Sequence, residues 1–190
     1  MDARTRELLA QLVADPKLKE LERLPLLPPV HLAMVVGVWG VFLGGSAAYL
    51  AGWLPLPVTL LLTAVAVYAS FTPLHDATHR AVSSNPFIND LIGTLSGNLL
   101  VPGMFTSMYR LLHLEHHRWV GDLERDPDTP LVHTRWPLLP LFLATPELVW
   151  AHWWITKLWH QRSVRERVEF FGSLSVYFAI HVALLLSPWA

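Results

Sequence analysis

Two long apolar runs occupy most of the first half of the chain. No residue from Leu24 to His75 carries a formal charge, and a gap of that length can hold two membrane spans of about 20 residues each. We predict the first span at residues 30–53 and the second at residues 57–73, with the turn "GWLPLP" between them. The alternative interpretation is a helical hairpin buried in a soluble protein.

The second half of the chain is apolar but more often interrupted. Residues 170–188 form an uninterrupted run and predict a further span. The segment from Pro137 to Trp159 contains three prolines, Glu147 and His152, and we predict that it lies along the membrane interface without crossing. The stretch "FINDLIGTLSGNLLVPGMF" is broken by Gly, Asn and Pro, which predicts a membrane-embedded element too short to span.

The polar leader, residues 1–29, has leucines at helical spacing on both sides of Pro16. This pattern predicts two short amphipathic helices. Such helices can lie on a membrane surface, and the alternative is an ordinary cap on the protein.

Charge distribution predicts the orientation of these segments. All Lys and Arg fall in two blocks, one before Leu24 and one between Arg80 and Arg167. The positive-inside rule places both blocks in the cytoplasm. The predicted fold class is therefore an all-α membrane protein with a transmembrane hairpin, a cytoplasmic region at residues 74–169 and a further transmembrane helix. Residues 30–190 would form one membrane domain, which we expect in a bacterial inner membrane.

Composition excludes several classes of function. Charged residues make up 15% of the chain, where about 25% is usual for soluble domains. The net charge of −1 provides no basic surface for nucleic acid. Because the chain has no Cys, it holds no disulfide, no thiolate-bound haem and no Cys-ligated iron–sulfur cluster.

Histidines are concentrated in two short motifs on the predicted cytoplasmic side. The first motif, "HDATH", contains His75 and His79, and the second, "HLEHH", contains His113, His116 and His117. On a helix, the spacing within each motif places the imidazoles on one face. Neutral imidazoles bind Zn, Cu, Fe or Ni, and five exceed the needs of one tetrahedral zinc. We therefore predict that the five imidazoles converge on two metals, or on one site completed by both helices.

Four other residues are weaker candidates for this site. His152 and His160 lie in the predicted interfacial segment and are candidate additional ligands. Asp76 and Glu115 lie inside the motifs but off the histidine face, where each could accept an imidazole N–H or simply be solvated. Neither motif has the H-E-x-x-H spacing of a zinc metalloprotease.

The two histidine motifs resemble those of the integral-membrane fatty acid desaturase superfamily. The matching stretches are "HDATHRAVSSNPFINDLIGTLSG" and "HLEHHRWVGDLERDPD". In that family an HxxxH or HxxxxH box follows the second span, and an HxxHH box lies on the same side. His75 and His79 match the first box, and His113, His116 and His117 match the second. The acidic run Asp126-Pro127-Asp128 after the second box also fits the family.

The resemblance implies a non-haem di-iron oxidoreductase of lipid metabolism that uses O₂ and two electrons to desaturate fatty acyl chains. The chain has neither Cys nor a Gly-rich dinucleotide fingerprint, so electrons would come from a separate ferredoxin or b-type cytochrome. A carotenoid hydroxylase is the alternative, because that branch of the superfamily uses the same boxes. A degenerate, metal-free membrane protein is the second alternative.

The family carries a third HxxHH-type box after a fourth span, and no such motif follows His117 here. The expected fold is therefore an incomplete four-span desaturase-like fold. We expect the 190-residue chain alone to bind iron substoichiometrically and to lack activity.

Overall fold

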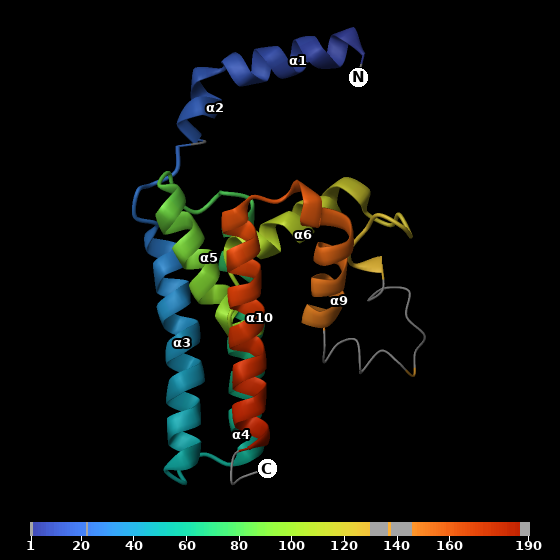
Figure 1. Ribbon diagram of the computed structural model, residues 1–190. Coiled ribbons are helices and arrows are strands. Elements are labelled where there is room, and N and C mark those ends of the chain that lie inside the picture. Colours follow the sequence, from blue (N-terminus) through green and yellow to red (C-terminus); the bar gives the residue numbers. More distant parts are fainter. Residues whose placement is uncertain (1, 22, 130–136, 138–145, 187–190) are drawn as a thin grey trace.

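The computed structural model describes residues 2–21, 23–129, 137 and 146–186, and the regular elements among them are all helical (Figure 1). This confirms the all-α prediction for the described residues. The α-helices are α1 (Ala3–Ala14), α2 (Pro16–Leu21), α3 (Pro29–Leu50), α4 (Leu56–Thr78), α5 (Pro86–Leu100), α6 (Thr106–Trp119), α9 (Pro146–Trp153) and α10 (Val164–Leu185). A π-helical turn η2 (Trp154–Leu158) and a 3₁₀ turn η3 (Trp159–Gln161) follow α9.

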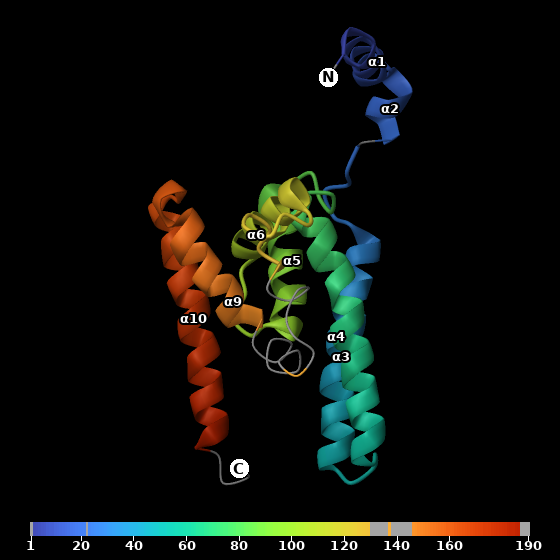
Figure 2. The same cartoon turned by 90° about the vertical axis from the view of Figure 1, so that its right-hand side faces the viewer.

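The predicted hairpin is formed by α3 and α4, which run side by side in both views (Figures 1 and 2). Both helices are long and apolar enough to cross a membrane. Their apolar side chains face outward, since Val36 is 71%, Leu61 64% and Tyr68 84% exposed. A hairpin buried in a soluble protein would hide such side chains, so the described surface favours lipid contact.

Helix α4 continues beyond the predicted end of the second span at residue 73. Pro73 lies inside the helix and is buried, and the helix runs on to Thr78. A proline inside a helix removes one backbone hydrogen bond and costs about 3 kcal/mol, yet α4 continues through Pro73. The first histidine motif therefore lies on the same rigid helix as the predicted span.

Helix α5 begins at Pro86, and Asn85 caps it by accepting hydrogen bonds from Phe87 N (2.9 Å) and Ile88 N (3.4 Å). Its 15 residues fall short of the roughly 20 that a span requires, as the interruptions in its sequence predicted. The helix packs beside α4, where Ile92 and Ala77 share an apolar cluster. Helix α5 therefore supports the end of α4 that carries the histidines.

The described part of the predicted interfacial segment does not lie flat across the helix ends. Helix α9 is steeply inclined and runs beside the upper half of α10 (Figures 1 and 2). The reason is a buried contact between elements, because the rings of Trp154 and Phe170 stack at a centroid distance of 4.3 Å and both are fully buried. Residues 138–145 of the predicted segment lie outside the described part of the chain.

The third predicted span corresponds to α10, which begins six residues earlier than the predicted start at residue 170. Ser163 and Glu166 explain this start, because the Ser163 N–H donates to Glu166 (2.8 Å) and Glu166 N donates to the Ser163 hydroxyl (3.3 Å). Helix α10 is not among the two described helices that meet the length and hydropathy criteria for a span. Its membrane crossing stays a prediction, and residues 187 and 188 lie outside the described chain.

The leader forms the two predicted helices, α1 and α2, and the break falls at Asp15 and Pro16. Asp2 caps α1 by accepting a 2.7 Å hydrogen bond from Thr5 N. Both helices project away from the remaining helices (Figure 1). Attachment of the leader to a membrane surface stays a prediction.

Candidate metal centre

Four imidazoles meet where the end of α4 faces α6. His75 lies in the last turn of α4 and His79 is its C-cap residue, while His113 and His117 lie one turn apart on α6. One ligand nitrogen from each of these histidines lies within 4.8 Å of the other three. The structure therefore brings together four of the five histidines of the two motifs.

The spacing of the nitrogens suits a metal ion. The Nε2 atom of His113 lies 3.1 Å from Nε2 of His79 and 3.0 Å from Nε2 of His117. Two imidazole nitrogens bound to one ion at a right angle, with bonds of about 2.1 Å, would lie about 3.0 Å apart. The donor set consists of neutral nitrogen ligands, which suit iron as well as zinc or copper.

The protonation state of these imidazoles also suits metal binding. Burial, followed by the neighbouring imidazoles of His117, His75 and His79, lowers the pKa of His113 from its ordinary 6.5 to about 4. Burial and the imidazoles of His75 and His117 lower the pKa of His79 as well. Both rings are therefore neutral at pH 7, and the neutral form is the one that binds metal.

His116, the fifth predicted ligand, lies beside this cluster and is held by carboxylates. Its ring centroid is 5.8 Å from that of His117. Its Nδ1–H donates to Asp126 Oδ1 at 2.8 Å, and Asp128 Oδ2 lies 3.4 Å away. In the neutral ring this hydrogen bond places the proton on Nδ1 and makes Nε2 the free nitrogen, which is the arrangement of metal-binding histidines with a carboxylate partner.

Asp126 is prepared for this contact by its surroundings. It is 5% exposed and accepts hydrogen bonds from the backbone N–H groups of Gly121 (2.9 Å) and Asp128 (2.9 Å). Burial alone would raise the pKa of Asp126, but the hydrogen bonds from His116, Gly121 and Asp128 hold the pKa below its ordinary value. The carboxylate therefore stays ionised and accepts the hydrogen bond from His116 Nδ1–H.

The two predicted carboxylates have different partners. Asp76 accepts a 3.0 Å hydrogen bond from His31 Nε2 and lies 3.5 Å from His75 Nδ1, so it stands next to the cluster as expected. Glu115, for which an imidazole partner or solvation was expected, has no imidazole partner among the described residues. Its carboxylate accepts from Arg118 Nη1 at 3.0 Å and from Trp119 Nε1 at 3.1 Å, since both donors lie along the same helix face.

The two candidate additional ligands lie outside both clusters. His152 and His160 are exposed, and among the described residues neither belongs to a group of potential ligands with the other histidines. Both precede α10 on the segment α9–η3, where Trp154 rather than a histidine is buried. The sequence predicted that both residues lie near the metal region, but among the described residues neither belongs to the group of candidate ligands.

Sequence reasoning missed two functions of side chains at this site. His31, to which the sequence analysis assigns no part in this site, reaches Asp76 from the start of α3. Asp126 and Asp128, which the sequence presents only as an acidic run that fits the family, lie against His116. A short acidic run that follows a histidine motif on a tight turn is the signal that could have identified the latter pair.

Comparison with known proteins identifies the family. The family model "Fatty acid desaturase" matches residues 51–190. The sn-1 acyl-lipid omega-3 desaturase (ferredoxin) of Nostoc sp. (strain 36) is 33% identical over 97 residues, covering 50% of this chain and 26% of that protein. The sn-1 oleoyl-lipid 12-desaturase of Anabaena variabilis is 26% identical over 151 residues, covering 72% of this chain and 42% of that protein.

A third relative, the omega-3 fatty acid desaturase of Brassica napus chloroplasts, is 30% identical over 123 residues. The chain spans between a quarter and a third of the length of the first curated relatives that it matches. No solved structure matches the chain significantly. The family model covers most of the sequence, including both histidine motifs, and the chain therefore belongs to the integral-membrane fatty acid desaturase superfamily.

Proposed function

We propose that the protein is a membrane-bound, O₂-dependent oxidoreductase that desaturates fatty acyl chains at a di-iron centre. The observation that carries this proposal is the convergence of four imidazoles from α4 and α6 within 4.8 Å. Curated relatives named as acyl-lipid desaturases support the choice of an acyl substrate. We propose His75, His79, His113, His116 and His117 as the iron ligands.

The chain's own residues would keep these ligands ready for iron. The lowered pKa values of His79 and His113 favour the neutral ring at neutral pH, in which one nitrogen of each imidazole is unprotonated. Asp126 holds the proton of His116 on Nδ1, which leaves Nε2 available. Iron bound by such neutral nitrogen ligands supplies the capacity to activate O₂ for attack on an unactivated C–H bond.

The position of the cluster suits a substrate that comes from the bilayer. His75 lies at the end of the apolar helix α4, so an acyl chain lying along this helix can approach the cluster. The opposite side of the cluster faces the predicted cytoplasm, from which a soluble electron donor can approach. Two relatives are named as ferredoxin-dependent, and we propose a ferredoxin as the donor.

Lipid analysis in a bacterial host tests this function. The host would express a ferredoxin and its reductase together with either this chain or the chain extended by a fourth span and an HxxHH box. Mass spectrometry of the acyl lipids should show a new double bond with the extended protein, and His113→Ala in the same protein should abolish it. An iron-loaded extended protein that forms no unsaturated product would refute the proposal, and a hydroxylated carotenoid would establish the alternative function.

A further inference from the structure

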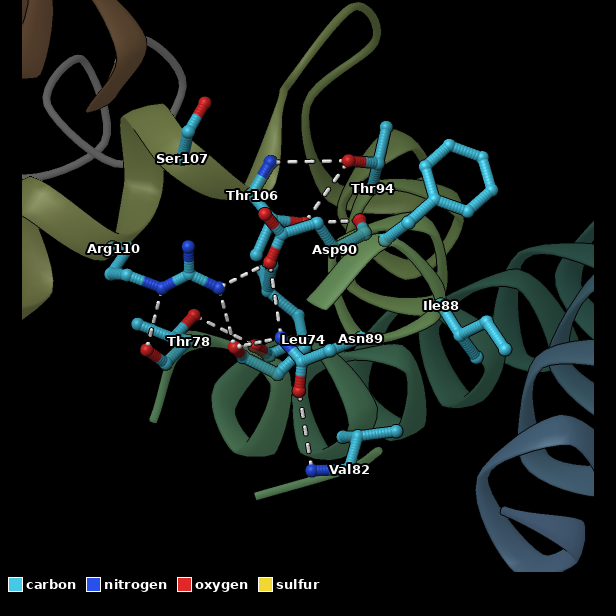
Figure 3. A network of polar contacts seen from close by, with 12 residues as sticks. Leu74, Thr78, Val82, Ile88, Asn89, Asp90, Thr94, Thr106, Ser107 and Arg110 are labelled. Carbon is cyan, nitrogen blue, oxygen red and sulfur yellow. Dashed lines mark hydrogen bonds and ion pairs between the residues drawn. The ribbon is translucent and has the colours of Figure 1, made fainter. Parts of the chain in front are cut away.

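Arg110 connects α6 to the end of α4 and to the start of α5 (Figure 3). Arg110 lies on α6, one turn before His113. Its Nε donates to the carbonyl of Thr78 at 2.9 Å, and its Nη2 donates to the carbonyl of Ala77 at 2.8 Å. These carbonyls directly precede His79, so one side chain of α6 holds the end of α4 that carries the first histidine motif.

The Arg110 guanidinium is itself fixed by α5. Its Nη2 donates to Asp90 Oδ1 at 2.5 Å, and Asn89 Nδ2 donates to the same oxygen at 3.1 Å (Figure 3). Asn89 is 1% exposed and also donates to the carbonyl of Ala77 at 2.8 Å. The Arg110 side chain is 12% exposed. The Asp90 side chain is 34% exposed, so the contact is a partly buried ion pair in which the arginine is the better shielded partner.

A second contact fixes the start of α6 against α5. The hydroxyl of Thr106 donates to the carbonyl of Asp90 at 2.8 Å, and Thr106 N donates to the hydroxyl of Thr94 at 3.2 Å. Helix α6 is thus attached at Thr106 and again one turn later at Arg110. Two attachment points on one helix fix its rotation as well as its position.

An arginine suits this place for physical reasons. The last carbonyls of a helix have no partner within the helix, and a positive charge there interacts favourably with the helix dipole. The planar guanidinium can donate in several fixed directions at once, to Thr78, Ala77 and Asp90. A lysine keeps the charge but cannot reproduce this fixed set of three bonds.

We propose that Arg110, held by Asp90 and Asn89, is a positioning residue that sets the separation between the two histidine pairs. The first pair is His75 and His79 on α4, and the second is His113 and His117 on α6. The inference rests on the proposed function in one respect, namely that these histidines bind metal. The proposal adds that the geometry of the histidine cluster depends on Arg110, a side chain outside the cluster.

The first test measures the separation of the helices without metal. The chain has no native Cys, so spin labels can be attached at Tyr68→Cys on α4 and Val120→Cys at the end of α6, which are 84% and 65% exposed. Double electron–electron resonance should give a narrow distance distribution with Arg110 and a broader or shifted one in Arg110→Lys. Arg118→Lys is the matched control, because Arg118 lies on the same helix but is 67% exposed and contacts Glu115.

The second test measures the site itself by titration with Co²⁺, whose absorption spectrum reports ligand geometry. Arg110→Lys should weaken Co²⁺ binding about ten- to a hundredfold, the usual effect of removing support from metal ligands. The helical circular dichroism should be unchanged, and Arg118→Lys should bind as the unmodified chain does. A general loss of fold would instead lower helicity and affinity together.

Each remaining result is decisive. An unchanged distance distribution or an unchanged Co²⁺ affinity in Arg110→Lys overturns the proposal. If Arg110→Lys loses its helical circular dichroism, the same Co²⁺ titration is carried out with Asp90→Asn, which removes the charge that holds Arg110. Weaker Co²⁺ binding at normal helicity then supports the proposal, and normal binding overturns it. If the unmodified chain binds no Co²⁺, the proposed metal site fails, while the distance measurement still decides whether Arg110 sets the separation.

Discussion

Among the five histidines of the two motifs, His116 makes the shorter contact with a carboxylate, 2.8 Å to Asp126 against 3.5 Å between His75 and Asp76. Asp126 accepts its Nδ1–H at 2.8 Å, and the Trp150 indole donates to Asp128 at 3.1 Å beside it. The other four imidazoles lie close to one another. At the scale of single residues the site therefore has two parts, a cluster of four imidazoles and one imidazole oriented by acid side chains.

Replacing Asp126 by Asn tests the orienting contact. The amide is a weaker acceptor than a carboxylate, so metal affinity should fall about tenfold or more. The exposed Glu124 follows the same histidine motif, and Glu124→Gln should leave the affinity unchanged. Competition titration with a zinc chelator measures both values, and equal affinities in the two variants would contradict the orienting role of Asp126.

The geometry of the imidazole cluster predicts which histidine variants lose metal. His113→Ala should remove most bound metal, because the His113 nitrogen lies 3.0–3.1 Å from two other ligand nitrogens. His152→Ala and His160→Ala should each retain the metal content of the unmodified chain, since both side chains are exposed and outside the cluster. Elemental analysis of the purified variants distinguishes these outcomes. Metal loss in either exposed variant would restore that residue as a ligand.

At the scale of elements, the close approach of α5 to its neighbours decides where the histidines lie. Gly93 is the residue that permits this approach, because a Cβ there would lie 2.7 Å from Ala77 Cβ and 2.5 Å from the Thr106 hydroxyl. Gly97 repeats the arrangement one turn later against Met104 and Leu74. The small residues of α5 thus bring it close enough for Asp90 to reach Arg110.

Gly93→Ala should therefore destabilise the protein by about 1–3 kcal/mol, the typical cost of overpacking. Gly44→Ala on α3 is the matched control, because a Cβ there meets nothing within 4 Å. Thermal unfolding in detergent, followed by circular dichroism, compares the two variants. A stable Gly93→Ala variant would show that α5 can move away from α4 without penalty.

The pKa of Asp90 predicts how the Arg110–Asp90 contact depends on pH. Burial would raise the pKa of Asp90, but hydrogen bonds from Arg110 and Asn89 and the charge of Arg110 hold it below its ordinary value of 3.8. The unfolded chain therefore binds the proton first, and the stabilisation by ionised Asp90 is lost as pH falls from about 3.8 through the lower folded-state pKa. Asp90→Asn should show a shallower loss of thermal stability below pH 4 than the unmodified chain. Equal slopes would contradict this contribution.

At the scale of the whole molecule, the turn of the apolar hairpin and the histidine cluster lie at opposite ends of α4. The turn after α3 lies at one end of the molecule, and the histidines, α6 and the start of α10 lie toward the other (Figure 1). The distribution of Lys and Arg predicts that the end with the histidines faces the cytoplasm.

Single-cysteine labelling tests this orientation, and the absence of native Cys makes it clean. Val164→Cys, at the start of α10, should react with a membrane-impermeant maleimide from the cytoplasmic side. Trp53→Cys, in the turn after α3, should react from the outer side. Both positions suit labelling because their side chains are 77% and 81% exposed. The reverse pattern would invert the topology, and labelling of both from one side would show that the hairpin does not cross.

The sequence by itself determined the features that depend on neighbouring residues. Apolar runs and proline positions predicted helices close to α1, α2, α3 and α4, because backbone hydrogen bonding and helical periodicity are local. The motif spacing placed His113 and His117 on one face for the same reason. The family also followed from the two motifs, and the family model confirmed it.

Only the tertiary structure decided which side chains support the histidines. Arg110 meets the carbonyl of Ala77 across 33 positions of sequence, and His31 meets Asp76 across 45. Such pairs depend on how helices pack, and no local pattern encodes them. The same holds for α9, whose inclination beside α10 follows from the burial of Trp154 against Phe170. Local hydrogen bonding thus fixed the helices, and burial of side chains between distant helices fixed the site.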